Sequence, residues 1–307
     1  MRATTRCESS EWTMYRHFRT RRLRRVIYPS NVLVRGLDIR HVDAHSHIDK
    51  YTAADIASVL DEIEHHRILT LAVSVDPASY QRTLEMTDRC PYIVPSFGIQ
   101  PWEAPRFVND LDALVMLTKN SPTIGEIGLD HRFITDPGAH LAQAAVFATM
   151  LDCAEADHKL VNIHSAGAER AVLEMVRTRN LENVILHWYS GPIETLGALL
   201  DCGCHFTIGV AVLYDEHIRA IARYIPDDRL LTETDNPGGE RFHTGRTGRP
   251  NLITQIETNV VDLRATDTDE LRSLVKRNAL RLVTRAPEPL LRSPLGLWER
   301  HASSRDT

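Results

Sequence analysis

The sequence predicts an α/β fold with a single (β/α)8 TIM barrel. From residue 40 onward, short apolar runs alternate with longer amphipathic stretches, which is typical of repeated βαβ units and a parallel sheet. The length of 307 residues also suits one such barrel, which takes about 250 residues, with further segments at its ends.

The apolar runs and amphipathic stretches give the elements in order. Eight runs are expected to be strands, at 40–45, 69–75, 93–99, 123–129, 160–164, 184–188, 205–210 and 230–234. Between them we expect helices near 53–66, 78–88, 107–119, 138–157, 167–179, 193–201 and 214–224, followed by helices near 249–264 and 268–284.

These elements predict one barrel domain at residues 39–285. It is preceded by a basic extension at 1–38, which we expect to be disordered because it lacks core residues of its own. A tail rich in proline and arginine follows at 286–307.

Composition and cysteine usage indicate a folded protein of a reducing compartment. Hydrophobic residues make up 43% of the chain, and no apolar run approaches the roughly 18 residues of a membrane span. The five cysteines, an odd number scattered along the chain, argue against a disulfide framework. The arginine-rich start has no apolar stretch that could serve as the core of a signal peptide. We therefore expect a cytoplasmic protein with no membrane partner.

Charge is unevenly distributed along the chain. Residues 1–29 carry eight arginines and two glutamates, which leaves 28 basic and 39 acidic residues in the remainder, a formal charge of −11. Such an acidic body is not a general nucleic-acid platform, because affinity for phosphate backbones comes mostly from lysine and arginine. A phosphate-bearing substrate would have to be held locally. The basic start could itself touch nucleic acid, although a disordered extension is the better interpretation.

Two histidines stand at the end of the first predicted strand, in Asp43-Ala44-His45-Ser46-His47. Successive strand residues point to opposite faces, so His45 and His47 share one face and could grip one cation. The alternative is a pair of solvent-exposed histidines at a strand end, which this stretch alone does not exclude.

Further histidines and acids stand at the ends of other strands, where the active site of a barrel is built. Glu126 lies in the fourth strand, and His164, His187 and Asp235 end the fifth, sixth and eighth. Any one of these histidines alone is more often a satisfied core or rim residue. Their coincidence at several strand ends favours a metal centre.

The donor set indicates the chemistry. Four imidazoles and two carboxylates exceed what one tetrahedral ion uses, and they suit two cations that share a bridging carboxylate. Such a pair lowers the pKa of a bound water and stabilises charge on the attacking and leaving oxygens, which predicts a hydrolase. Asp235 is the candidate for accepting a proton from that water, and the alternative is a plain ligand. Asp43 is expected to orient an imidazole or to shape the floor of the site.

Several motifs occur in order between about residues 40 and 284. They are Asp43-Ala44-His45-Ser46-His47-Ile48-Asp49, Gly98-Ile99-Gln100-Pro101, Ile124-Gly125-Glu126-Ile127-Gly128-Leu129-Asp130, the strand-end residues His164 and His187, Leu230-Leu231-Thr232-Glu233-Thr234-Asp235-Asn236-Pro237 and Asn278-Ala279-Leu280-Arg281-Leu282. In these motifs the chain resembles the TatD family of metal-dependent deoxyribonucleases, within the amidohydrolase superfamily.

The resemblance implies a barrel of the metal-dependent hydrolase type that cleaves DNA from its ends, as a 3′–5′ exonuclease. It implies Asp235 and Glu126 as catalytic residues and two divalent cations, Mg²⁺ by family, although imidazole ligands suit Zn²⁺ or Mn²⁺ equally. One cation would be held by His45, His47, Glu126 and Asp235, and the other by Glu126, His164 and His187.

Departures from the family pattern suggest the substrate contacts. Gln100 stands where family members usually carry histidine, so a pocket residue that could contact phosphate becomes a neutral amide. The segment 238–249 is expected to be a basic loop, and its Arg246 and Arg249 are candidates for binding phosphate. Trp188 directly follows His187 and could stack on a base, with packing under the barrel rim as the alternative. This last segment also resembles TatD-type nucleases of antiphage defence systems, which implies partners from a defence gene cluster.

Three functions are therefore weighed. The leading one is a two-metal phosphodiesterase acting on DNA ends or single strands. Hydrolysis of a small cyclic amide or ester is the second, and Glu126 weighs against it, because many such amidohydrolases use a carboxylated lysine on the fourth strand. A scaffold without activity is the third, and the six retained ligands make it the weakest.

Overall fold

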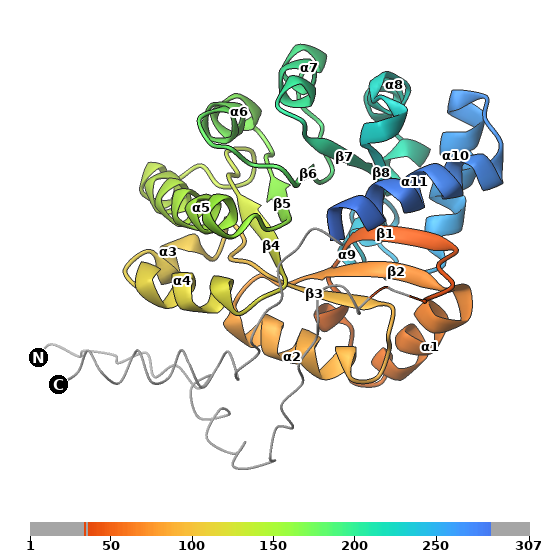
Figure 1. Ribbon diagram of the computed structural model, residues 1–307, viewed down its shortest axis with the longest axis horizontal. Coiled ribbons are helices and arrows are strands. Elements are labelled where there is room, and N and C mark those ends of the chain that lie inside the picture. The colour runs from red at the N-terminus through yellow and green to blue at the C-terminus, as the bar shows by residue number, and fades with distance from the viewer. Residues whose placement is uncertain (1–33, 35, 284–307) are drawn as a thin grey trace, which may run out of the picture.

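Eight short runs of apolar and β-branched residues form one parallel sheet, whose strands follow one another in chain order (Figure 1). The computed structural model describes residue 34 and residues 36–283. The strands are β1 (His41–Ser46), β2 (Ile68–Val73), β3 (Ile93–Phe97), β4 (Thr123–Gly128), β5 (Val161–His164), β6 (Val184–Leu186), β7 (His205–Ile208) and β8 (Leu230–Thr232).

The seam between β1 and β8 brings the first and last strands together. The backbone N–H of Asp235 donates to the carbonyl of His45 at 2.9 Å, and the Thr232 hydroxyl donates to the carbonyl of Val42 at 2.7 Å. These bonds join residues 190 positions apart in the sequence, and they make the eight strands a nearly closed barrel.

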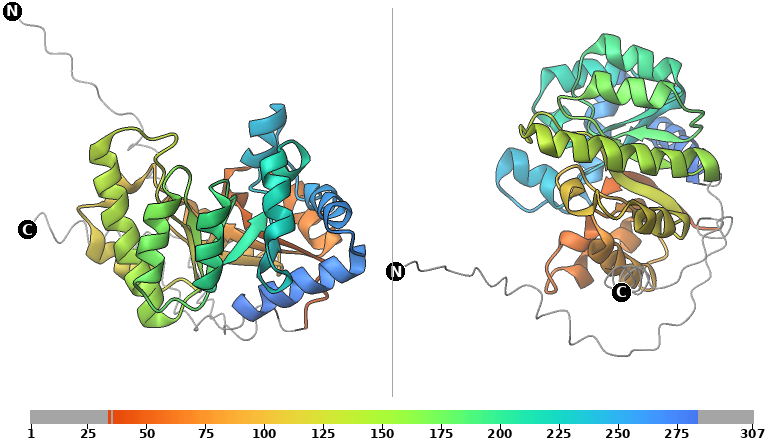
Figure 2. Two further views of the ribbon diagram at one scale, coloured as in Figure 1. Left: turned by 90° about the horizontal axis from the view of Figure 1, so that it is seen from above. Right: turned by 90° about the vertical axis from the view of Figure 1, so that its left-hand side faces the viewer.

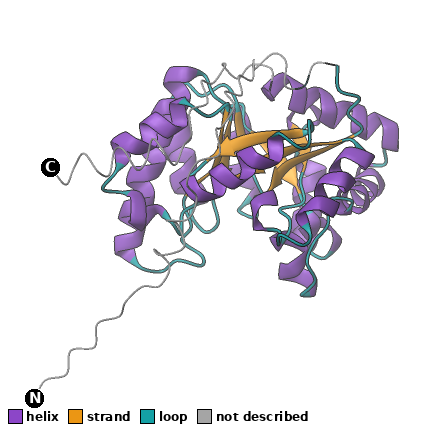
Figure 3. Cartoon of the chain, turned by 90° about the horizontal axis from the view of Figure 1, so that it is seen from below, coloured by secondary structure: helices purple, strands orange, loops and turns teal. Residues whose placement is uncertain are grey.

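Helices surround this sheet on its outer side (Figures 2 and 3). They are α1 (Ile56–His66), α2 (Pro77–Thr87), α3 (Ala104–Phe107), α4 (Leu111–Lys119), α5 (Pro137–Asp157), α6 (Glu169–Arg177), α7 (Ile193–Asp201), α8 (Glu216–Tyr224), α9 (Gly238–Thr244), α10 (Leu252–Arg264) and α11 (Thr268–Val283). Short 3-10 turns lie at Ile48–Lys50, Val210–Leu213 and Asp227–Arg229.

Local sequence signals account for several helix starts. The carboxylate of Asp76 accepts the backbone N–H of Ser79, and Pro77 occupies the first turn of α2. Asp136 and Pro137 begin α5 in the same manner. Because these residues satisfy free N–H groups or fix the backbone angle of the first turn, the predicted helix starts at 78 and 138 lie within one residue of the observed ones.

The predicted (β/α)8 barrel is confirmed, with two local corrections. The stretch 107–119 was expected to be one helix, but α3 ends at Phe107 and α4 starts at Leu111, because the chain bends at Asn109-Asp110 and Asp110 precedes a new helix. The expected loop at 238–249 contains helix α9, which ends where Gly245 adopts a left-handed conformation with φ of 75°.

Buried apolar side chains of the strands and helices form one continuous core. Val34 is buried against this core, and Leu37 packs on it. Residues 1–33 and 35 of the expected extension, and the whole of the expected tail, lie outside the described residues. Within the described residues, no helix has the length and apolarity needed to cross a membrane, and Cys90, Cys153, Cys202 and Cys204 are all free thiols.

Candidate metal centre

The end of β1 carries two imidazoles that face the same point. The pairing of β1 with β2 shifts register between Asp43 and Ser46, immediately around His45. The Nε2 atoms of His45 and His47 lie 3.4 Å apart, and both side chains are buried. The structure thus confirms the predicted juxtaposition of these histidines and excludes a solvent-exposed pair.

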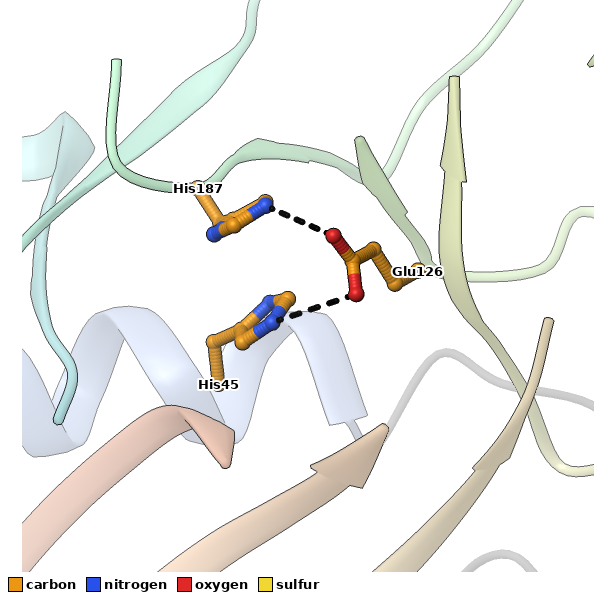
Figure 4. Close-up of side chains that lie close together, drawn as sticks. All are labelled: His45, Glu126 and His187. Carbon is orange, nitrogen blue, oxygen red and sulfur yellow. Dashed lines mark ion pairs between the residues drawn. The ribbon is translucent and has the colours of Figure 1, made fainter. Parts of the chain in front are cut away.

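Glu126 in β4 lies between two sets of imidazoles. Its Oε2 lies 3.1 Å from Nε2 of His47 and 3.9 Å from Nε2 of His45. Its Oε1 lies 3.2 Å from Nδ1 of His164 and 3.3 Å from Nε2 of His187. Each carboxylate oxygen therefore faces one pair of histidines, and Figure 4 shows one oxygen directed at His45 and the other at His187.

A glycine allows β4 and β5 to approach beside this carboxylate. Gly128 has φ of 138°, and a Cβ at this position would lie 2.0 Å from the carbonyl oxygen of His164. Any side chain there would push His164 away from Glu126. The glycine in the motif thus permits the distance between the two ligand-bearing strands.

Asp235 reaches the His45–His47 pair from the end of β8. Its Oδ1 lies 3.6 Å from Nε2 of His45 and 3.4 Å from Nε2 of His47. The residue has φ of 50°, in the left-handed region that non-glycine residues seldom adopt. The seam hydrogen bond from its backbone N–H to His45 holds this conformation, which is typical of backbone strain at a functional site.

The six predicted ligands therefore come together at the carboxyl ends of the strands. Two sets have ligand atoms within 4.8 Å of one another, namely His45–Glu126–His187 and His45–His47–Asp235. Oε2 of Glu126 is buried and accepts no hydrogen bond from the described residues. An unpartnered buried carboxylate oxygen among imidazole nitrogens is costly alone and fits the donor set of a divalent cation.

A second polar group orients each of two imidazoles. Nδ1 of His45 lies 2.9 Å from Oδ1 of Asn162, and Nδ1 of His47 lies 3.1 Å from the carbonyl of Val73. These contacts leave both Nε2 atoms facing the site. Histidines that bind a metal are typically oriented in this way, by a polar group at the other ring nitrogen.

The other two histidines have carboxylate neighbours. Nε2 of His164 lies 2.8 Å from Oδ2 of Asp130. Nδ1 of His187 lies 3.8 Å from Oε2 of Glu233, whose other oxygen accepts the backbone N–H of Trp188 at 2.9 Å. Asp130, Glu233 and Asn162 are functional neighbours that the ligand prediction missed. Asp130 and Glu233 lie inside the motifs, and Asn162 shares a strand face with His164, which was the available signal.

Asp43 lies at the seam beneath the ligands. Its carboxylate accepts the backbone N–H of Thr234 at 2.8 Å and the Thr234 hydroxyl at 2.6 Å. It therefore ties β1 to the residue before Asp235, which agrees with the predicted role in shaping the floor.

Burial and neighbouring charge set the protonation of the ligands. Burial, together with nearby His187, holds the pKa of His45 well below its usual value, so this imidazole is neutral and its lone pair is available. Burial would raise the pKa of Glu126, but the imidazoles of His164, His187 and His47 beside its oxygens bring it well below its usual value. Burial raises the pKa of Asp235, which makes this carboxylate a better proton acceptor than an exposed aspartate.

The predicted substrate contacts lie in different surroundings. Gln100 is half-buried after β3, and its backbone N–H donates to the carbonyl of Val75. Trp188 is half-buried beside α9. Arg246 has a side chain that is 77% exposed and pairs with Glu240 at 3.2 Å.

Arg249, the fourth predicted substrate contact, is held by several hydrogen bonds. Its guanidinium donates two hydrogen bonds to Oε2 of Glu62 on α1, at 3.0 and 2.7 Å, and a third to the Ser58 hydroxyl. This arrangement attaches the segment after α9 to α1.

Comparisons with known proteins agree with the site. Residues 42–284 match the family described as TatD related DNase. The metal-dependent hydrolase YcfH of Escherichia coli K12 is 27% identical over 253 residues, which cover 78% of this chain and 94% of YcfH. Human deoxyribonuclease TATDN3 is 23% identical over 265 residues, which cover 81% of this chain and 96% of that protein.

A solved structure shows the same fold. The crystal structure of YJJV, a TatD homolog from Escherichia coli K12, superposes with a TM-score of 0.73 at 20% identity, over 79% of this chain and 97% of that one. The family match spans most of the barrel and includes the positions of all six predicted ligands. The chain therefore belongs to the TatD-related DNase family of metal-dependent hydrolases.

Proposed function

We propose that the protein hydrolyses phosphodiester bonds of DNA, as a 3′–5′ exonuclease that removes nucleotides from strand ends. The observation that carries this proposal is the position of Glu126, whose two carboxylate oxygens each face a separate pair of imidazoles. Such a carboxylate suits a bridge between two cations, and two-cation sites are typical of phosphodiester hydrolysis. The naming of TATDN3 as a deoxyribonuclease supports DNA as the substrate.

The residues divide into two proposed ligand sets around Glu126. His45, His47 and Asp235 would hold one divalent cation with Oε2, and His164 and His187 the other with Oε1. Mg²⁺ is the ion that the family resemblance favours, and the four imidazoles suit Mn²⁺ or Zn²⁺ as well. When bound, such cations supply Lewis acidity toward a phosphate oxygen and lower the pKa of a nearby water.

The chain's own side chains would handle the proton and the substrate. Asp235, with its raised pKa and partly exposed carboxylate, would accept the proton of the attacking water. Arg246 would pair with a substrate phosphate in place of Glu240, because an exposed ion pair is easily exchanged. Trp188 and Gln100 would contact the nucleotide. Arg249 would reach a phosphate only by leaving Glu62.

The experiment is digestion of a single-stranded and a double-stranded oligonucleotide by the purified protein with Mg²⁺ or Mn²⁺. With a 5′ label we expect a ladder of products shortened from the 3′ end. Asp235→Asn should lower the rate by several orders of magnitude while circular dichroism shows an intact fold. An intact protein that releases no nucleotide with either cation contradicts the proposal.

The alternative, hydrolysis of a small cyclic amide or ester, is tested by adding lactones and dihydropyrimidines to the same assay. Turnover of these compounds without digestion of DNA would favour it. The free cysteines of the described residues agree with the proposed cytoplasmic location. Partners from a defence gene cluster stay a prediction.

A further inference from the structure

Four aromatic rings meet at the barrel rim, on the loops that follow β6, β7 and β8. We call Trp188, Tyr214, Phe242 and His243 the aromatic cluster. The His243 ring is stacked on Tyr214, with centroids 4.9 Å apart, and on Trp188 at 5.8 Å. Phe242 meets Trp188 and His243 edge to face, at 6.0 and 5.1 Å. The cluster thus has two partly buried inner rings and two outer rings.

The outer rings are exposed to an extent that packing does not explain. Tyr214 is 53% exposed and Phe242 is 69% exposed, whereas Trp188 and His243 beneath them are half-buried. Helix α9, which carries Phe242, contributes a single buried residue, Gly239, to the protein interior. The two neighbouring outer rings therefore offer apolar ring surface at the rim to which a ligand could bind.

The position of the cluster connects it to the metal centre. Trp188 directly follows the ligand His187, and its backbone N–H bonds to Glu233. Helix α9 starts three residues after Asp235. Both ends of the cluster therefore lie close in sequence to predicted metal ligands, on segments that follow strands at the same rim of the barrel.

Positive charge accompanies the rings on the same segment. Arg241 precedes Phe242 in α9, and Arg246 follows the helix with an exposed guanidinium. Flat apolar rings beside arginines, on an otherwise acidic protein, match a nucleotide, which has an aromatic base and an anionic phosphate. A protein partner would meet the rings without needing the neighbouring arginines.

We propose that Tyr214 and Phe242 form a subsite for one unpaired nucleobase of the DNA strand whose end lies in the metal centre. The base stacks on one outer ring and meets the other edge to face, because Phe242 is perpendicular to the His243 ring on which Tyr214 is stacked. Trp188 and His243 support the outer rings. This inference rests on the proposed function and assigns the cluster a positioning role, because the rings hold the strand and touch no reacting atom.

The test compares two 5′-labelled single-stranded oligonucleotides of one sequence, one complete and one with abasic tetrahydrofuran sites at its last three positions. Binding is measured by fluorescence anisotropy in EDTA, so that no turnover occurs. For Tyr214→Ala/Phe242→Ala we expect the Kd of the complete strand to rise about ten- to hundredfold, and that of the abasic strand to stay unchanged. A 2-aminopurine near the 3′ end should be quenched by the native protein and not by the variant.

Two further variants separate the loss of base stacking from general damage to the fold. Phe242→Tyr, which keeps a ring, should bind as the native protein does. Tyr224→Ala removes a ring with 50% exposure at the far end of α8, remote from the metal centre, and should change nothing.

Native protein that binds and digests the complete and abasic strands equally well would overturn the subsite and leave the proposed function standing. A double variant whose Kd rises equally for the complete and the abasic strand would also overturn it. Self-association of the native protein through these rings would overturn it as well. Failure to digest either strand with Mg²⁺ or Mn²⁺ would instead contradict the proposed function.

Discussion

Asp130 holds His164 by one ring nitrogen, with Oδ2 of the carboxylate 2.8 Å from Nε2 of the imidazole. Only Nδ1 of His164 is then left to face Glu126, at 3.2 Å. Oδ1 of Asp130 meanwhile accepts the backbone N–H groups of Arg132 and Phe133. One buried carboxylate thus orients both a ligand and the loop that follows β4.

The variant Asp130→Asn should weaken metal binding at the His164–His187 side. The amide can still accept the loop N–H groups at Oδ1, but it replaces a charged acceptor at His164 with a neutral group. We expect metal affinity to fall by about 10- to 100-fold, measured by isothermal titration with Mn²⁺ or Zn²⁺. Asp136→Asn, which changes an exposed cap of α5, is the matched control. Unchanged affinity in Asp130→Asn would show that His164 needs no anchor.

Metal binding should stabilise the fold, and Glu126 should be required. A cation at a hundred times its Kd adds about 2.7 kcal/mol to the free energy of unfolding, because it binds the folded site alone. Thermal melts with and without Mn²⁺ measure this as a rise in Tm, which EDTA should reverse. Glu126→Gln removes the charge that both imidazole pairs face, so most of the rise should be lost. If Mn²⁺ raised the Tm of Glu126→Gln as much as that of the native protein, the cation would bind elsewhere.

A buried histidine far from the ligands should make stability depend on pH. Burial, with Arg229 and Arg281 nearby, lowers the pKa of His205 to about 4. The unfolded chain, in which this histidine titrates near 6.5, binds more protons between these values. The free energy of unfolding should therefore fall as pH drops from 6.5 toward 4, by up to about 3 kcal/mol from this group.

Urea unfolding at several pH values measures this slope. His205→Leu should make this slope shallower, because one buried imidazole fewer is left to protonate on unfolding. His65→Gln, at an exposed position of α1, should keep the native slope. A slope that is equally steep in His205→Leu would assign the pH dependence to other groups.

Two arginines of the segment after α9 should behave differently. Arg246→Ala removes a cation that is exposed, so the free energy of unfolding should change by less than about 1 kcal/mol. DNA affinity should fall, and the slope of log affinity against log salt concentration should decrease by about one. Arg249→Ala removes the hydrogen bonds to Glu62, so it should destabilise the fold by about 1–3 kcal/mol. Unfolding curves and anisotropy titrations at two salt concentrations separate the effects. If DNA affinity fell in Arg249→Ala and not in Arg246→Ala, Arg249 would be the arginine that contacts DNA.

That the candidate ligands gather at one site could be predicted from sequence, because their positions follow from strand position. His45, Glu126 and His164 each stand at or near the end of an apolar run, and parallel strands in a barrel bring such ends together. No knowledge of side-chain contacts was needed, since backbone topology alone places these residues at one rim.

Hydrogen-bond and ring contacts that exist only in the folded protein could not be predicted from sequence. Asn162 shares a strand face with His164, yet it bonds to His45 across the barrel, 117 positions away in the sequence. Helix α9 also escaped prediction, because its seven residues are rich in glycine and polar groups and show no helical pattern of apolar residues. Its Phe242 meets Trp188 only in the folded protein.

The seam between β1 and β8 also has a consequence for the order of folding. His45 and His47 come from the first strand and Asp235 from the last, so this ligand set exists only after the barrel has closed over nearly the whole domain. Joining residues so distant in sequence is entropically slow and comes late in folding. A nascent chain that lacks β8 has no such set, so tight cation binding there distinguishes a completed chain from a truncated one.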